Sequence, residues 1–85
     1  MIYEIGSVLS VRNLWAVITG YEGSDYRVYF PFRDAYETVE ENNIRPIIGK
    51  YDLDKAYFAG VKWMCQAKNP SLQLKWVQGQ EDSHE

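Results

Sequence analysis

Five short runs that favour β-strands follow one another in the first half of this 85-residue chain. They are rich in β-branched and aromatic residues and are separated by tight turns. The runs cover residues 8–12, 15–19, 26–30, 36–39 and 44–46, and a proline follows or ends two of them. Strands this short cannot form a sandwich with two independent faces, and closure removes exposed edges. The sequence therefore predicts a mainly β fold, a small antiparallel barrel that is closed or nearly closed.

The third run shows the clearest alternation of side chains. Tyr26, Val28 and Phe30 share one face, and Arg27 and Tyr29 share the other. Because successive side chains of a strand point to opposite faces, the first three are expected inside the barrel. Tyr29 is expected to be partly exposed.

One helix is predicted at about residues 52–68. Asp52 or Asp54 is a good N-cap, and Asn69-Pro70 ends the pattern. Steps of three and four place one apolar stripe on this helix, with Lys55 and Lys62 on the opposite, solvated side. The stripe consists of Leu53, Ala56, Tyr57, Gly60, Val61, Met64 and Lys68. Phe58, Trp63 and Cys65 fall outside it, which indicates a helix covered on more than one side.

The last part of the chain alternates and then becomes polar. In residues 71–77, Leu72, Leu74 and Trp76 share a face, which favours either a sixth strand or an edge offered to a partner. Residues 78–85 are expected to be a disordered polar tail. The predicted organisation is thus a barrel at 1–48, a helix and short strand packed on it at 49–77, and the tail.

The scarcity of cysteine and histidine limits the chemistry. Cys65 and His84 are the single residues of their kinds, so an internal disulfide and a cysteine-rich zinc site are excluded. A His-based metal or catalytic site would need the penultimate residue. Cys65, within a helix and without a partner, is expected to be a small buried apolar residue rather than a nucleophile. We therefore expect no enzymatic activity, no metal and no cofactor.

The charge and hydropathy patterns address location. No run of about 20 apolar residues is present and the first residues do not form a secretory signal, so no membrane association is expected. A cytoplasmic location, or a nuclear one in a eukaryote, is the expectation. A formal net charge of −3 speaks against strong nonspecific binding of nucleic acid.

The first half of the chain resembles a Tudor-like domain with an SH3-type barrel. The resemblance lies in the glycine entry at Gly6, the alanine–valine second strand, the glycine hairpin at Gly23, the alternating third strand and the ending Ile44-Arg45-Pro46. It covers residues up to 48. Chromo-barrel modules and the small barrels at the start of bacterial helicase-like ATPases are similar in the same way.

The resemblance implies a binding module rather than an enzyme. Many Tudor-like domains hold a methylated lysine or arginine in a cage of aromatic rings by cation–π attraction. By position, Phe30 matches one wall of such a cage, and Leu14 stands where the family usually has Trp or Tyr. The acidic residues near the loop, Asp34 and Glu37, would favour a cationic ligand. The expected partner-binding residues are Trp15, Phe30, Phe32, Asp34, Tyr36 and Glu37.

Two other surfaces are candidates. The helix and the last segment carry more large apolar side chains than are needed to cover one face of the barrel, which favours a second interaction surface or a homodimer. These side chains are Phe58, Trp63 and Trp76.

Residues 49–79 carry five lysines against two aspartates. A candidate nucleic-acid face, weak by itself, therefore consists of Lys55, Lys62 and Lys68, with Arg12, Arg27 or Arg33. The leading hypothesis is a module that binds a protein or peptide. An accessory nucleic-acid-binding domain and a structural homodimer are the alternatives.

Overall fold

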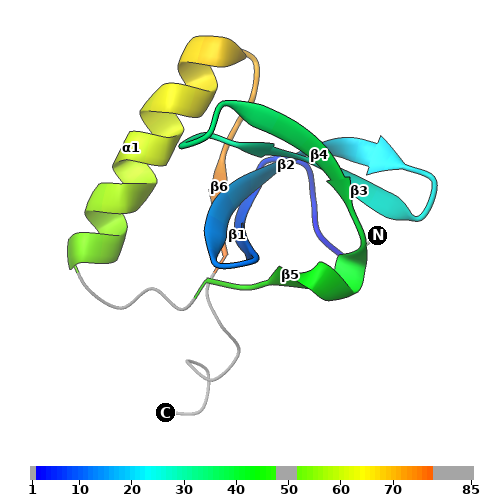
Figure 1. Ribbon diagram of the computed structural model, residues 1–85. Coiled ribbons are helices and arrows are strands. Elements are labelled where there is room, and N and C mark those ends of the chain that lie inside the picture. The colour runs from blue at the N-terminus through cyan, green and yellow to red at the C-terminus, as the bar shows by residue number, and fades with distance from the viewer. Residues whose placement is uncertain (1, 48–51, 78–85) are drawn as a thin grey trace.

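The computed structural model describes residues 2–47 and 52–77 and contains one sheet and one long helix (Figure 1). The elements are β1 (Ser7–Val11), β2 (Leu14–Glu22), β3 (Asp25–Phe30), β4 (Ala35–Val39), the 3₁₀ helix η1 (Glu41–Asn43), β5 (Ile44–Arg45), α1 (Asp52–Lys68) and β6 (Lys75–Trp76). The predicted mainly β fold, with five antiparallel strands, a following helix and a sixth short strand, is confirmed. The expected tail at 78–85 and the boundary at residue 48 lie outside the described residues.

The five main strands form an antiparallel sheet in the order β4-β3-β2-β1-β5. The sheet curls around its interior, and η1 leads from its β4 end to its β5 end (Figure 1). Within the described residues β4 and β5 do not pair with each other, so the sheet is curled but not closed. The turn between β1 and β2 is tight, with Arg12 and Asn13 both at positive φ.

Side-chain alternation along the strands gives the sheet two apolar faces. The inner face holds Tyr26, Val28 and Phe30, as predicted, with residues from every other main strand. Tyr26 also bonds polar groups at the edge of the interior, because its hydroxyl donates to Glu41 Oε1 at 2.9 Å and accepts from the backbone N–H of Ile2. The inner cluster comprises Leu9, Val11, Ala16, Ile18, Tyr26, Val28, Phe30, Val39 and Ile44.

The outer face is covered by α1. Val8 and Val17 pack there against Val61 and Cys65 of the helix, together with Tyr29, Ile47 and Leu72. The expectation that Tyr29 is partly exposed is therefore wrong, because α1 buries the outer face of β3. Burial of Cys65 is confirmed.

The side of α1 that packs on the sheet is not the apolar stripe that the sequence predicted. Its buried side runs through Phe58, Val61 and Cys65, whereas Tyr57 is about half exposed. A helix that is apolar around most of its girth offers two stripes with similar spacing, and the sequence pattern does not choose between them. The predicted stripe mixed residues of both.

The chain returns to the sheet at β6, where only Lys75 and Trp76 pair, in parallel with Ser7 and Val8 of β1. The backbone N–H of Lys75 donates to the carbonyl of Gly6 at 2.6 Å. Gly6 has a φ of +97°, and a Cβ there would collide with the carbonyl oxygen of Gln73. Glycine at this position therefore allows the last segment to lie against β1.

Candidate interaction surface

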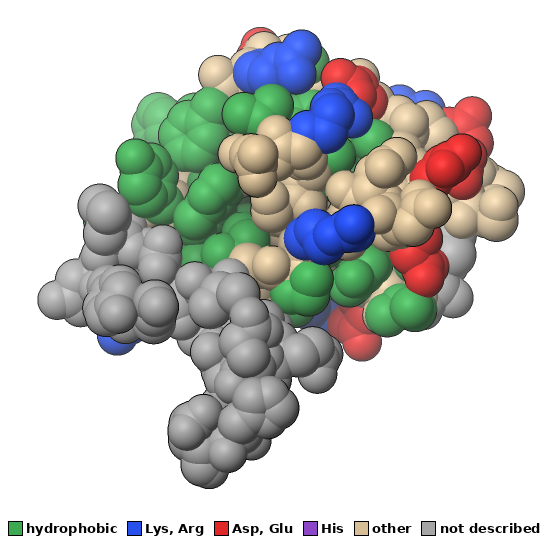
Figure 2. All heavy atoms as spheres, turned by 60° about the horizontal axis from the view of Figure 1, so that its bottom comes forward, with side chains coloured by type: hydrophobic (Ala, Val, Ile, Leu, Met, Phe, Trp, Pro, Cys, Tyr) green, Lys and Arg blue, Asp and Glu red, His purple; other side chains and the backbone are tan. Residues whose placement is uncertain are grey.

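Three large aromatic side chains are exposed on the side of the molecule where α1 lies. The exposed fractions are 52% for Phe32, 49% for Tyr57 and 74% for Trp63. Phe32 comes from the β3–β4 loop, and its ring meets that of Tyr57 edge-on, with 6.3 Å between centroids. Figure 2 shows hydrophobic side chains gathered on the side of α1 and most acidic ones on the other side.

Two shallow hollows connect these rings to their surroundings. One, of about 280 Å³, is lined by Phe32, Ala56, Tyr57 and Gly60. The other, of about 300 Å³, has Pro31 and Tyr29 on one side and helix residues that include Trp63 on the other. Asp34 and Lys68 also line the second hollow. We call the uncharged loop and helix residues of both hollows the α1–loop surface, and define it as Pro31, Phe32, Ala56, Tyr57, Gly60, Trp63, Met64 and Ala67.

Local contacts hold the loop against the helix. Pro31 follows the last residue of β3, and the N–H of Arg33 donates to the carbonyl of Phe30 at 3.1 Å. Asp34, at positive φ, accepts a hydrogen bond from the Tyr29 hydroxyl at 2.7 Å and one from Lys68 Nζ at 3.3 Å. These two donors, Tyr29 first, hold the pKa of Asp34 below its usual value. Burial, and then the bond to Asp34, raises the pKa of Tyr29.

Phe30, the expected wall of an aromatic cage, lies inside the molecule. The guanidinium groups of Arg12 and Arg33 lie over its ring, 5.6 and 5.5 Å from the centroid. Glu37 accepts from Arg12 at 2.6 Å and lies 3.9 Å from Arg33. The position that a cationic ligand would take at this ring is thus occupied by the chain's own cations.

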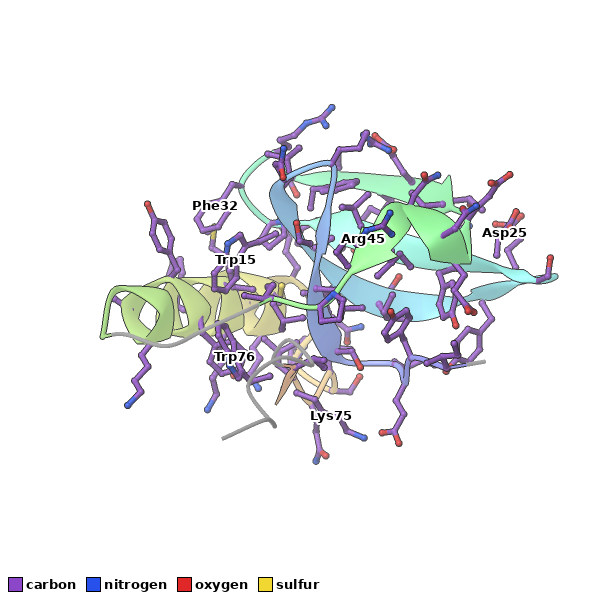
Figure 3. The ribbon with its side chains drawn as sticks, turned by 90° about the horizontal axis from the view of Figure 1, so that it is seen from below. Trp15, Asp25, Phe32, Arg45, Lys75 and Trp76 are labelled. Carbon is purple, nitrogen blue, oxygen red and sulfur yellow. The ribbon has the colours of Figure 1, made fainter. Side chains whose placement is uncertain are left out.

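The other expected cage residues are not brought together around Phe30. Trp15 is half-buried and contacts the rings of Tyr57 and Trp76, at 5.8 and 5.2 Å. Tyr36 is exposed and packs on Tyr29 at 4.7 Å. Figure 3 shows Phe32, Trp15 and Trp76 in a row that runs across the direction of α1. The two expected acidic partners of a ligand, Asp34 and Glu37, each have a basic side chain beside them.

The expected second surface is also divided. Phe58 and Trp76 meet edge-on at 4.7 Å and both pack against the cluster under α1, so they stabilise the fold. Trp63 alone of the three is largely exposed. Tyr57 belongs to the surface and was missed by the sequence reasoning, which placed it in the buried stripe. The stripe through residues 56, 60, 63 and 67 indicates the side on which Trp63 lies, but Tyr57 lies at the border of that stripe and the sequence pattern holds no signal for its exposure.

The lysines of the candidate nucleic-acid face are separated by their contacts. Lys55 and Lys62 are exposed on α1 and are not part of the α1–loop surface. Lys68 is paired with Asp34. Of the arginines, Arg12 and Arg33 face Glu37, and Arg27 lies 3.6 Å from Glu22. Acidic partners therefore reduce the positive potential that phosphate binding needs.

Another hollow, of about 550 Å³, lies elsewhere, between the β1–β2 turn and β5. Its arginines are already engaged, since Arg12 reaches Glu37 and Arg45 Nη1 donates to the carbonyls of Asn42 and Ile44. The volume alone does not make this a binding site. Its lining consists of Ser10, Arg12, Asn13, Trp15, Asn43, Arg45, Pro46 and Ile47.

The described residues show little chemistry of other kinds. Burial raises the pKa of the Cys65 thiol to about 11, which leaves it protonated at neutral pH. No group of three or more His, Cys, Asp or Glu side chains within 2–47 and 52–77 is placed to hold a metal. In the same part of the chain, no helix has the length and hydropathy to cross a membrane.

Comparisons with known protein families, with curated proteins and with solved structures found no match for this chain.

Proposed function

We propose that this chain is a non-catalytic interaction module that binds a protein partner or peptide through the α1–loop surface. The observation that carries the proposal is the exposure of three large rings beside two hollows of the loop and α1, with Phe32 and Tyr57 at one hollow and Trp63 at the other. Exposed apolar patches of this kind mark interaction sites on proteins. Aromatic side chains in shallow pockets also carry much of the binding energy at interfaces.

The proposal keeps the general role implied by the Tudor-like resemblance and changes the place of binding. Tudor-like domains bind partners at the aromatic end of the barrel, which corresponds here to the region around Phe30. Arg12 and Arg33 cover that ring. A partner with an apolar contact segment therefore suits the α1–loop surface better than a methylated cation suits Phe30. A reducing location, cytoplasmic or nuclear, belongs to the proposal because Cys65 is a free thiol.

The chemistry of the surface favours a protein over a nucleic acid. Its eight residues are uncharged, and Lys68, which lines the second hollow beside them, is paired with Asp34. Binding to phosphates weakens steeply with salt, whereas an apolar contact changes little. The partner is accordingly expected to present apolar or aromatic side chains, with binding that persists at high salt.

Selection of peptides from a phage-displayed random library on the full chain tests the proposal. Selected peptides are synthesised and their affinity is measured by fluorescence polarisation at low and high salt. We expect the Trp63→Ala and Phe32→Ala variants to lose about tenfold or more in affinity, because each removes an aromatic anchor. The matched control is Lys62→Ala, a change at the neighbouring exposed position.

A labelled DNA oligonucleotide serves as the second probe. If peptides bind equally well to wild type and to both aromatic variants, the proposed surface is wrong. Strong binding of DNA that falls with salt and with Lys55→Ala or Lys62→Ala would instead establish the nucleic-acid alternative.

A further inference from the structure

The α1–loop surface carries a projection and a hollow side by side. The projection is Trp63, the most exposed large apolar side chain among the described residues. The hollow of about 280 Å³ beside Phe32 and Tyr57 reaches Gly60. Gly60 and Trp63 are three residues apart on one helix. The hollow and the projection are therefore neighbours on the surface of α1, about one turn apart.

We infer that the partner of this surface is a second copy of the same chain. The two α1 helices would run antiparallel about a two-fold axis near Gly60, and each Trp63 would enter the other copy's hollow. A two-fold interface needs such a self-complementary patch, in which one residue meets another and the reverse contact is also made. The inference rests on the proposed function, since it names the partner of the same surface.

The residues near the axis fit this arrangement. Gly60 has no side chain, and no described atom lies within 4 Å of the place of its Cβ, so another helix can approach there. Tyr57 and Trp63 stand three residues before and after Gly60, which brings Trp63 of one helix to the level of Tyr57 of the other in an antiparallel pair. A cavity of about 150 Å³ suffices for a benzene ring, so a hollow of about 280 Å³ admits an indole.

The distribution of charge favours the same pairing. The residues of the α1–loop surface are uncharged, and the two charged residues that line its second hollow, Asp34 and Lys68, form an ion pair with each other. A group of acidic side chains, Asp25, Glu40 and Glu41, surrounds a hollow near Tyr3 at the β2–β3 hairpin. Figure 3 shows Asp25 at the end of the molecule away from α1. Contact through α1 therefore keeps the acidic regions of two copies, each with net charge −3, apart.

The apolar area indicates how tight the contact would be. From their exposed fractions, Phe32, Tyr57 and Trp63 expose together about 400 Å², taking about 150–250 Å² for a whole aromatic side chain. With the smaller neighbours, two copies would bury about 1,000 Å². This lies at the low end for specific interfaces, so we expect a dimer that dissociates on dilution.

Sedimentation of the full chain over a range from about 5 to about 500 µM tests the inference. We expect the average mass of the wild type to rise with concentration toward that of two chains. Trp63→Ala removes the projection and Ala56→Glu places a charge in the hollow. Each should weaken association by about tenfold or more, whereas Lys62→Ala should not. Circular dichroism verifies that the variants are folded, and both changed side chains are exposed.

Three outcomes would overturn the inference. The first is a wild type that remains a single chain at every concentration. The second is association that survives both variants, which would place the contact on another surface. The third is a single chain that binds selected peptides through Trp63. In that case the proposed function stands and the partner is a different protein. Loss of both the association and the Trp63-dependent peptide binding would overturn the two proposals together.

Discussion

Phe30 and Phe32 are two residues apart, yet the regions around them have opposite characters. Phe30 ends β3 with its ring in the interior, beneath the guanidinium groups of Arg12 and Arg33. Phe32 follows Pro31 in the loop, and its ring lies half exposed against Tyr57 of α1. At one end of the curled sheet, two arginines of the chain itself cover the aromatic ring. The α1–loop surface is apolar, and no described residue covers it.

This difference separates rings that stabilise the fold from rings that are available for binding. Phe30 has no free face, because two cations and the inner cluster contact it. Phe32, Tyr57 and Trp63 have free faces and shallow hollows beside them. Composition alone counts these four rings equally, and only their surroundings distinguish them.

The largest effect should come from truncating the two phenylalanines separately. Phe30→Ala removes a fully buried ring and should lower the free energy of unfolding by about 3–5 kcal/mol. Phe32→Ala should lower it by less than about 1 kcal/mol, because half of that ring is already in water. Urea denaturation of both variants measures the difference. Equal losses would contradict the comparison.

The sequence pattern predicted which side chains are buried more accurately on β3, around Phe30, than on α1, around Tyr57. Alternation along β3 placed Phe30 inside correctly, since a strand has only two faces. For α1 the pattern allowed two apolar sides, and the choice depends on packing against Val8 and Val17 of the sheet. Tyr57 was therefore assigned to the wrong side.

Long-range contacts were also beyond the sequence pattern. The pair formed by Arg12 and Glu37 joins residues that are 25 positions apart. Whether Asp34 faces a ligand or Lys68 depends on how α1 is placed, 34 positions later. The sequence identified these residues as charged neighbours of aromatic rings, and the fold determined their partners.

A methyl group on the uncovered side of α1 should be tolerated. Gly60→Ala replaces a poor helix former where no described atom lies within 4 Å of the new Cβ. We expect the free energy of unfolding of dilute protein to rise by about 0.5–1 kcal/mol. Thermal or urea denaturation at low concentration measures it. A loss of stability would mean that this side of the helix is covered.

A smaller effect is expected at the charged end of the sheet. Glu37→Gln removes the carboxylate that lies between Arg12 and Arg33. Because these side chains are partly exposed, stability should fall by about 1 kcal/mol or less, and less still at high salt. Urea denaturation at two salt concentrations tests this. A salt-independent loss of several kcal/mol would show that the pair is a major element of the fold.

The smallest effect concerns pH and the contact between the loop and the helix. The hydrogen bonds from Tyr29 and Lys68 lower the pKa of Asp34 in the folded chain. A lowered pKa stabilises the fold above the unfolded value, about 3.9, and this contribution is lost as the pH falls through the folded value. Asp34→Asn should therefore be less stable than wild type near pH 6, with the difference shrinking below about pH 4. Urea midpoints across this range measure it, and a constant difference would contradict the assignment.

The central claim is that partners contact the α1–loop surface and not the end of the sheet at Phe30. Nuclear magnetic resonance of the isotope-labelled chain, titrated with the tightest peptide from the selection, tests it most directly. We expect shifts of the Trp63 indole N–H and of the amides of residues 31–33 and 56–67. Shifts confined to Arg12, Phe30 and Glu37, on addition of that peptide or of a methylated lysine peptide, would contradict it.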